Sequence, residues 1–359
     1  MKKYIGILVA AILVACNICG CASSAGQMAD SGAQSASASD ADLRIVTTIF
    51  PEYDWVCEVL GDRADSADVT MLLNNGVDLH SFQPTADDIL KIASCDVFIY
   101  VGGESDEWVD DALKEAVNKD MVVINLLEVL GDIVKTEEIV EGMEHKHDHE
   151  DEDHDHEDED HDHEDEDHDH EEEDHDHEHE EELDEHVWLS LRNAAILTDA
   201  IADGLAKADP DNADSYRANA DAYKSKLGTL DKEYTAAVEA GSVHTLLFGD
   251  RFPFRYMVDD YGLDYYAAFA GCSAETEASF ETIVFLADKT DELGLGAIMT
   301  IEGTDHSIAE TVRDNTSGKD QQILTLDSMQ STTLKDAENG TTYLSVMTSN
   351  LEVLKEALK

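Results

Sequence analysis

The sequence predicts an α/β protein in which two Rossmann-like lobes, each with a parallel sheet, are joined by a long rigid helix. Eight short apolar runs typical of buried strands alternate with helical patterns, an order that favours parallel strands with helical crossovers. Four of these runs precede a long segment with helical periodicity and four follow it, which separates the two lobes. The chain has 359 residues, enough for two domains of ordinary size.

The N-terminus predicts a lipoprotein signal peptide over residues 1–21. A short basic start precedes an apolar run over 4–15, which is too short for a transmembrane helix of about 20 residues. Leu-Val-Ala-Cys ending at Cys16 and Ile-Cys-Gly-Cys ending at Cys21 both resemble a lipobox, so either cysteine is a candidate lipid anchor. An ordinary secretory signal is the alternative. Residues 22–42 are rich in Ser, Ala and Gly and predict a flexible tether.

Residues 43–210 are predicted to form the N-terminal lobe. Its apolar runs predict strands over Arg44–Phe50, Val69–Leu73, Val97–Val101 and Val122–Leu126. Helical patterns occupy the intervals at Tyr53–Leu60, Thr85–Ala93 and Glu107–Val117. A His- and acid-rich insert over 141–185 interrupts this lobe.

The linking helix is predicted over residues 211–240. Asp209 is suited to the N-cap, Pro210 to the first helical position and Gly241 to the C-terminal stop. Apolar residues recur at helical spacing in one stripe: Tyr216, Ala220, Tyr223, Leu227, Leu230, Tyr234 and Val238. A helix of this length spans about 45 Å. We therefore expect it to run along both lobes and to limit hinge motion between them.

Residues 241–359 are predicted to form the C-terminal lobe. Strands are expected over Thr245–Phe248, Tyr265–Phe269, Ala297–Ile301 and Ile323–Leu326. Helices are expected over Phe280–Leu293 and Ser307–Asn315. The two lobes together hold Cys57, Cys95 and Cys272, an odd number that allows one disulfide at most, and their spacing does not select a pair.

The charge of the chain narrows the range of partners. With 23 basic and 82 acidic residues the formal net charge is −59, which excludes a nucleic-acid partner and disfavours docking to an anionic membrane by charge. Residues 144–182 hold much of this excess, with 26 acidic residues, 12 histidines and one lysine. Without an apolar position, this His/acid tract is predicted to be disordered.

Imidazole and carboxylate at this density predict weak binding of divalent metal ions. Imidazole favours Zn²⁺, Cu²⁺ and Ni²⁺, whereas carboxylates alone would favour Ca²⁺, Mg²⁺ or Mn²⁺. The neighbouring carboxylates should raise the pKa of the histidines, so metal binding should weaken as the pH falls. A purely solvating acidic run is the alternative. The predicted low-affinity ligands are His145, His147, His149, His154, His156, His161, His163, His168, His170, His175, His177 and His179.

Two histidines outside the tract lie in loops that suit a ligand site. His80 follows a predicted strand and precedes a predicted helix, and ligands of α/β proteins bind at the carboxyl ends of strands. His186 comes directly after the insert. A single loop histidine is more often structural than a ligand, and a separation of 106 residues does not itself connect the two.

Motifs around both histidines do connect them. The segments are Thr47–Pro51 with Tyr53, Asp78–Thr85 with Asp88-Ile89, His186–Leu189 with Asn193-Ala194, Tyr261–Leu263 and Leu326-Asp327. Over about residues 43–359 the chain resembles the zinc/manganese substrate-binding lipoproteins of bacterial ABC importers. A His- and acid-rich insert before the second histidine is common in the zinc-specific branch of that family.

The resemblance implies a set of metal ligands. His80 and His186 match the first two ligands, and Asp327 matches the carboxylate ligand of the C-terminal lobe. The third position of the family, a His or Glu, is occupied here by Arg251, whose guanidinium stays protonated and cannot bind a metal. Candidate substitutes are Asp250, Glu302 and His306. Alternatively, Arg251 holds Asp327 or Asp250 in place from outside the coordination sphere.

From the signal motif, the His/acid tract and the resemblance, we expect a monomeric, lipid-anchored receptor on the extracytoplasmic face of the membrane. It would bind Zn²⁺ between its lobes and deliver it to an ABC permease and its ATPase. A manganese receptor of the same type, and a surface zinc store or adhesin acting through the His/acid tract, are the alternatives. An enzyme is not expected, because neither a His-Glu-x-x-His pair nor a Gly-x-Ser-x-Gly motif occurs.

Overall fold

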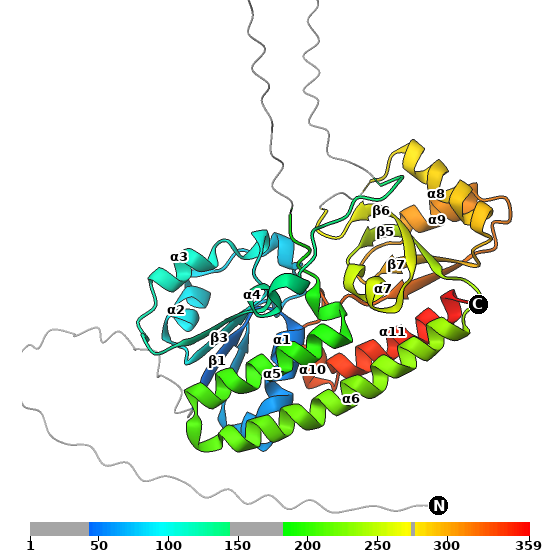
Figure 1. The fold of residues 1–359 in the computed structure, drawn as a ribbon. Helices are drawn as coiled ribbons and strands as arrows, with labels where there is room; N and C mark the ends of the chain where they lie inside the picture. Colours follow the sequence, from blue (N-terminus) through cyan, green and yellow to red (C-terminus); the bar gives the residue numbers. More distant parts are fainter. Residues whose placement is uncertain (1–42, 144–181, 274–276) are drawn as a thin grey trace, which may run out of the picture. The chain divides into compact units, whose positions relative to one another are not determined.

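A computed structural model of the chain describes residues 43–143, 182–273 and 277–359 (Figure 1). The predicted signal peptide with Cys16 or Cys21, the tether and the His/acid tract up to residue 181 lie outside the described residues. Within the described part, no helix has the combination of length and apolar character that crossing a membrane requires.

The N-terminal lobe is built on a parallel sheet in the order β2-β1-β3-β4. Its strands are β1 (Arg44–Thr47), β2 (Asp68–Met71), β3 (Val97–Tyr100) and β4 (Val122–Asn125). The helices of this lobe are α1 (Phe50–Leu60), α2 (Ala86–Ser94), α3 (Val109–Lys114) and α4 (Leu126–Leu130). All four predicted strands are present. Thr85 caps α2 because its hydroxyl accepts a hydrogen bond from the Asp88 N–H.

The C-terminal lobe repeats the same topology with a parallel sheet in the order β6-β5-β7-β8. Its strands are β5 (Thr245–Phe252), β6 (Asp264–Ala270), β7 (Ala297–Ile301) and β8 (Gln322–Leu326). Its helices are α7 (Arg255–Tyr261), α8 (Phe280–Leu293), α9 (Ser307–Asn315), α10 (Leu334–Glu338) and α11 (Tyr343–Ala357). Strand β5 extends beyond the predicted end at Phe248, because a bulge between Phe248 and Arg251 shifts its pairing with β6.

In the sequence, helices α5 (Leu191–Ala208) and α6 (Ala213–Ala240) come after the strands of the first sheet and before those of the second. The seven residues predicted as the apolar stripe are the seven buried residues of α6. The α-helix begins later than predicted, because Pro210–Asn212 form a 3₁₀ turn. The side chain of Asp209 caps neither helix. Instead it accepts hydrogen bonds from the side chains of Asn212 and Tyr216.

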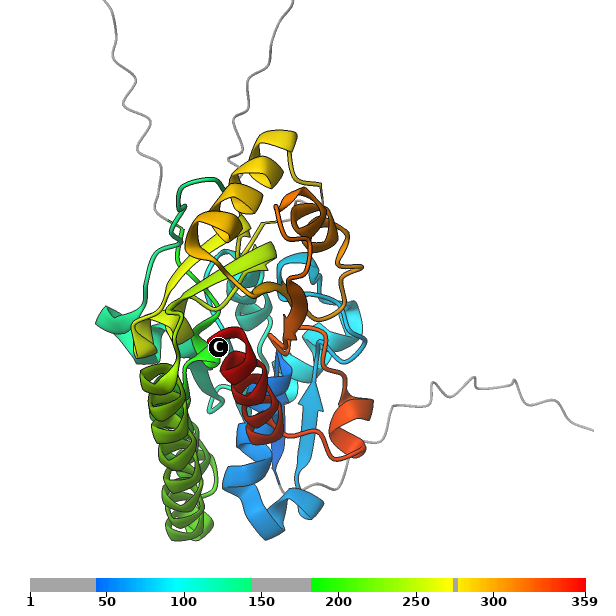
Figure 2. The same cartoon turned by 90° about the vertical axis from the view of Figure 1, so that its right-hand side faces the viewer.

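The long helix connects both lobes by packing. Helix α6 packs against α1 of the N-terminal lobe and against the neighbouring helix α5. It also packs against α7 and α11 of the C-terminal lobe (Figures 1 and 2). Tyr343 of α11 donates a hydrogen bond to the Trp188 carbonyl, and Tyr234 of α6 donates one to the Met347 carbonyl. One buried apolar cluster runs through residues of both lobes. This continuous packing opposes large rotations of one lobe against the other.

Short 3₁₀ turns complete the described structure. They are η1 (Gly61–Ser66), η2 (Leu79–Ser81), η3 (Glu104–Asp106), η4 (Gly131–Ile133), η5 (Val187–Leu189) and η6 (Pro210–Asn212). Turns η2, η3 and η5 are the ones that carry or support the site described below.

A buried carboxyl at the contact between α1 and α11 predicts that stability depends on pH. Asp54 accepts a hydrogen bond from the Tyr343 N–H, and burial raises its pKa to about 7. The folded chain therefore keeps a proton that the unfolded chain loses at about pH 4. The stability contributed by Asp54 is complete below that pH and is lost as the pH rises through 7. Between pH 5 and 8 we expect the loss to be about 2 to 3 kcal/mol.

Asp54→Asn should remove this part of the pH dependence, because an amide does not titrate. The measurement is the free energy of unfolding of the metal-free chain by denaturant between pH 5 and 8. Asp62→Asn, at an exposed position on η1, is the matched control and should leave the curve unchanged. An Asp54→Asn curve as steep as that of the unchanged chain would contradict the prediction.

Candidate metal centre

His80 is held on turn η2, in the connection that follows strand β2. Asp78 precedes the turn, and its Oδ1 accepts a hydrogen bond from the His80 N–H at 3.0 Å. The imidazole Nδ1 lies 2.8 Å from Ser105 Oγ and 3.4 Å from Glu185 Oε2. These oxygens fix the orientation of the ring at Nδ1, so that Nε2 is available for a different partner.

His186 lies at the start of turn η5, a few residues after the His/acid tract. Its side chain is fully buried. Asp184 fixes it twice, since Oδ1 accepts a hydrogen bond from the His186 N–H at 2.9 Å and lies 3.0 Å from the ring Nδ1. A carboxylate beside Nδ1 accepts the proton of that nitrogen and leaves Nε2 available as a ligand, an arrangement common to histidines that bind metal.

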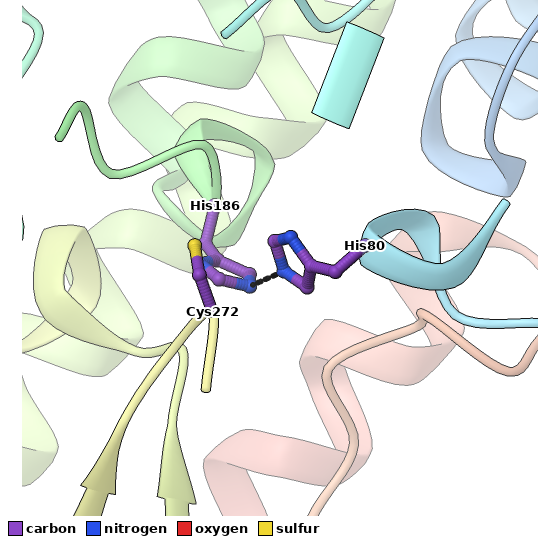
Figure 3. Close-up of side chains that lie close together, drawn as sticks. All are labelled: His80, His186 and Cys272. Carbon is purple, nitrogen blue, oxygen red and sulfur yellow. Dashed lines mark hydrogen bonds between the residues drawn. The ribbon is translucent and has the colours of Figure 1, made fainter. Parts of the chain in front are cut away.

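The two histidines face each other through their free nitrogens. Figure 3 shows the rings of His80 and His186 meeting at Nε2, and the two Nε2 atoms are 3.2 Å apart. A tetrahedral zinc ion with Zn–N bonds of about 2.0–2.1 Å would hold two nitrogens about 3.3 to 3.4 Å apart. The pair therefore already has the spacing that a shared zinc ion requires.

The electrostatics of the pair favour the metal-binding protonation state. Burial and the neighbouring His186 lower the pKa of His80 to about 3, so its ring is neutral at pH 7. Burial acts to raise the pKa of Asp78, but the Arg251 guanidinium outweighs it and holds that pKa below its usual value. Two further carboxyls, Asp184 and Glu185, border the rings. This acidic surrounding attracts a cation.

Cys272 is a third potential ligand at this position. Among the described residues, His80, His186 and Cys272 are the set of three metal-binding side chains whose donor atoms all lie within 4.8 Å of one another (Figure 3). Cys272 follows strand β6, and its N–H donates to Glu137 Oε1 at 2.8 Å. The thiol is free, as are those of Cys57 and Cys95, so none of the three forms the disulfide that the sequence allowed.

The preceding residue, Gly271, explains how the C-terminal lobe comes so close to His186. A Cβ added to Gly271 would lie 2.9 Å from His186 Cε1 and 2.9 Å from the Phe252 carbonyl oxygen. Both distances are too short for a side chain, so only glycine permits this approach. The Gly-Cys pair at the end of β6 thus places a sulfur beside the imidazoles.

The other predicted ligands lie outside this cluster. Asp327 Oδ1 accepts a hydrogen bond from the Met329 N–H, in the loop after β8. Asp250 accepts from the Ile301 N–H and the Thr304 hydroxyl, and Glu302 accepts from Ser328. His306 Nδ1 lies 2.8 Å from the hydroxyl of Thr300. These contacts hold loops of the C-terminal lobe together.

Arg251, at the third ligand position of the resemblance, bridges two loops. Its Nη2 lies 2.8 Å from Asp78 Oδ2, and its Nη1 donates to the Ser273 carbonyl at 3.4 Å. The guanidinium thus pairs with Asp78 rather than with Asp327 or the Asp250 carboxylate. Because Asp78 also accepts from the His80 backbone, Arg251 supports the turn that carries His80.

A cavity of about 550 Å³ adjoins the pair. Its walls include His80, Ser105, Glu185 and Cys272, together with Glu182 and Leu183. Glu182 is the last residue of the predicted His/acid tract and Leu183 follows it, so the tract joins the described structure at the wall of this cavity.

Comparisons with known proteins identify the family of the chain. The family model "Zinc-uptake complex component A periplasmic" matches residues 45–357. Zinc-binding protein AdcA of Streptococcus pyogenes serotype M3 is 30% identical over 313 residues, which are 87% of this chain and 55% of the relative. The chain thus spans about half the length of that protein. High-affinity zinc uptake system protein ZnuA of Bacillus subtilis is 28% identical over 99% of this chain and 98% of the relative.

A solved structure shares the fold over most of the chain. The Zn(II)-bound ZnuA-like domain of Streptococcus pneumoniae AdcA superposes with a TM-score of 0.64 at 26% identity. The superposition covers 88% of this chain and 98% of that domain. Its α/β architecture agrees with the fold predicted from sequence. With the family model extending over nearly the whole of both lobes, the chain belongs to the family of zinc-uptake component A proteins, which are transport proteins and not enzymes.

Proposed function

We propose that this protein is an extracytoplasmic receptor that binds a zinc ion at His80 and His186 and delivers it to an ABC permease and its ATPase. The observation that carries the proposal is the facing pair of Nε2 atoms, 3.2 Å apart, with the other nitrogen of each ring held by an oxygen. Zinc is the cargo of such a receptor, so the site must bind the ion and also release it.

The donor atoms favour zinc over manganese. Imidazole nitrogen is a good ligand for zinc, whereas manganese prefers carboxylate, carbonyl and water oxygens. The proteins to which the chain is similar are described as zinc-binding or zinc-uptake proteins, and the solved domain holds Zn(II). Manganese binding at the same site is the alternative that titration separates from zinc binding.

The His/acid tract supplies a second part of the proposed mechanism. Its predicted weak sites would raise the local zinc concentration, and its last residue, Glu182, lines the cavity. An ion released from the tract would have a short path to His80. The signal motif at Cys16 or Cys21 would keep the receptor at the membrane, as a monomer beside its permease.

Deletion of residues 144–182 tests whether the tract binds zinc weakly while the histidine pair binds it tightly. The full chain is expected to bind several zinc equivalents weakly and one tightly, whereas the deletion variant should keep the tight equivalent alone. The measurement is zinc titration at pH 7 in competition with a chromophoric chelator, with manganese titrated in parallel. Loss of all zinc binding on deletion would favour the zinc-store alternative, and tighter binding of manganese would favour the manganese receptor.

A further inference from the structure

We propose that Cys272 is the third ligand of the bound metal, so that the site consists of two imidazoles from the N-terminal lobe and one thiolate from the C-terminal lobe. This inference rests on the proposed function, because it concerns the same site. It assigns a sulfur ligand that the resemblance does not supply.

The geometry places the sulfur within reach of the ion. The donor atoms of Cys272, His80 and His186 all lie within 4.8 Å of one another. For a tetrahedral ion with a Zn–S bond of about 2.3 Å and a Zn–N bond of about 2.05 Å, the S···N distance is about 3.6 Å. The separation of the sulfur from either donor nitrogen exceeds this distance by no more than about 1.2 Å, and a rotation of the Cys272 side chain or a small shift of its loop closes such a gap.

The surroundings of Cys272 hold it in position for this role. Its N–H donates to Glu137 Oε1, and the next residue, Ser273, accepts a hydrogen bond from Arg251 through its carbonyl. Arg251 also pairs with Asp78, whose carboxylate holds the His80 backbone. The guanidinium thus fastens the loop of Cys272 to the turn of His80, and Gly271 brings that loop against the His186 ring.

The topology gives an independent reason for a ligand at this position. Strands β2 and β6 are the second strands of their lobes, and both lie at the edge of a sheet beside the first strand. His80 follows β2 and Cys272 follows β6, so the two lobes present ligands from corresponding connections. The cysteine thereby supplies the C-terminal-lobe donor that Arg251 cannot.

A thiolate ligand changes the chemistry of the site in a defined way. On binding, the thiol loses one proton to the solvent and a Zn–S bond forms, without any change of oxidation state. Thiolate sulfur favours zinc and other soft ions strongly over manganese. The inference therefore narrows the range of metals that the receptor takes up.

Cobalt(II) is a suitable probe, because a cobalt–thiolate bond produces a near-ultraviolet charge-transfer band that imidazole and carboxylate ligands do not. The His/acid tract has no cysteine and cannot produce this band. We expect one equivalent of Co²⁺ added to the reduced full-length protein to give the band, and Cys272→Ser to lose it. The zinc affinity of Cys272→Ser should fall at least 10-fold. Cys57→Ser, which alters a free thiol on α1, is the matched control and should retain both.

A second measurement uses the unchanged chain and so does not depend on a variant that folds. One equivalent of zinc should slow the alkylation of Cys272 by iodoacetamide, mapped by mass spectrometry, and leave the alkylation of Cys57 unchanged. A tightly bound cobalt ion without the charge-transfer band, together with unprotected Cys272, would overturn the sulfur ligand and leave the proposed function standing. Absence of any tight equivalent in the unchanged chain would overturn both.

Discussion

Replacing His186 with alanine should abolish tight zinc binding and lower the affinity of the site at least about 100-fold. Loss of an outer hydrogen-bonding partner alone costs a metal site about 10- to 100-fold, and loss of a ligand costs more. His186 is fully buried between Asp184 and Trp188, so neither water nor a tract histidine can readily take its place. His80→Ala should act in the same direction. The measurement is zinc titration of each variant in competition with a chelator of intermediate affinity.

The matched control for these variants is His244→Ala. His244 is exposed, precedes β5 and lies outside the metal cluster. Its replacement should leave the tight equivalent unchanged, and all three variants should keep the weak binding that we assign to the tract. If His80→Ala and His186→Ala each bind one zinc ion as tightly as the unchanged chain, the site between the lobes is not the receptor site.

The secondary structure was largely predictable because it depends on local patterns. All eight strands occur where apolar runs were found, and the stripe of seven residues on α6 is buried as its spacing indicated. The differences lie at element ends. Strand β5 continues past Phe248 through a bulge, a feature set by pairing with β6 and not by hydrophobicity. The turn at Pro210–Asn212 similarly replaces the first turn predicted for the long helix.

The site was less predictable because its parts are distant in the chain. His80 and His186 are separated by 106 residues, and only the resemblance of their motifs to a known family linked them. From the sequence alone, Cys272 is a candidate only for a disulfide. Recognising it as the counterpart of His80 requires the strand order of both sheets, which places β2 and β6 at corresponding edges. A Gly-Cys pair directly after a predicted strand was the available sequence signal.

The chemistry of Arg251 predicts that it is not a metal ligand, but it does not predict which residue the guanidinium pairs with. Its permanent charge excludes it as a ligand. Its partner, Asp78, lies 173 residues away, so nothing in the sequence indicated that pair. Asp250 and Glu302 are candidate ligands by their carboxylates, which in the structure accept hydrogen bonds from backbone N–H and hydroxyl groups of neighbouring loops. Carboxylates at strand ends serve such loops as readily as they serve metals.

Trp188→Ala should have the largest effect on stability among the changes considered, about 3 to 5 kcal/mol. The indole is fully buried, and its Nε1 donates a hydrogen bond to the Ser328 carbonyl at 2.8 Å. The backbone carbonyl of Trp188 accepts a hydrogen bond from the Tyr343 hydroxyl. Trp188 therefore ties the segment that carries His186 to the loop after β8 and to α11. Its removal leaves a cavity and an unpaired carbonyl at that junction. The measurement is the free energy of unfolding of the zinc-free chain in denaturant.

Trp188→Phe separates packing from hydrogen bonding at the same position. A phenyl ring keeps most of the buried contact but cannot donate to Ser328, so we expect a smaller loss of about 1 to 3 kcal/mol. The ring of Trp188 also lies 5.3 Å from that of His186 between centroids, so Trp188→Ala should weaken zinc binding as well, by about 10-fold, whereas Trp188→Phe should affect it less. If Trp188→Ala lowers the free energy of unfolding by less than about 1 kcal/mol, the indole does not connect the two segments as proposed. Removal of a fully buried indole that joins two segments costs more than this.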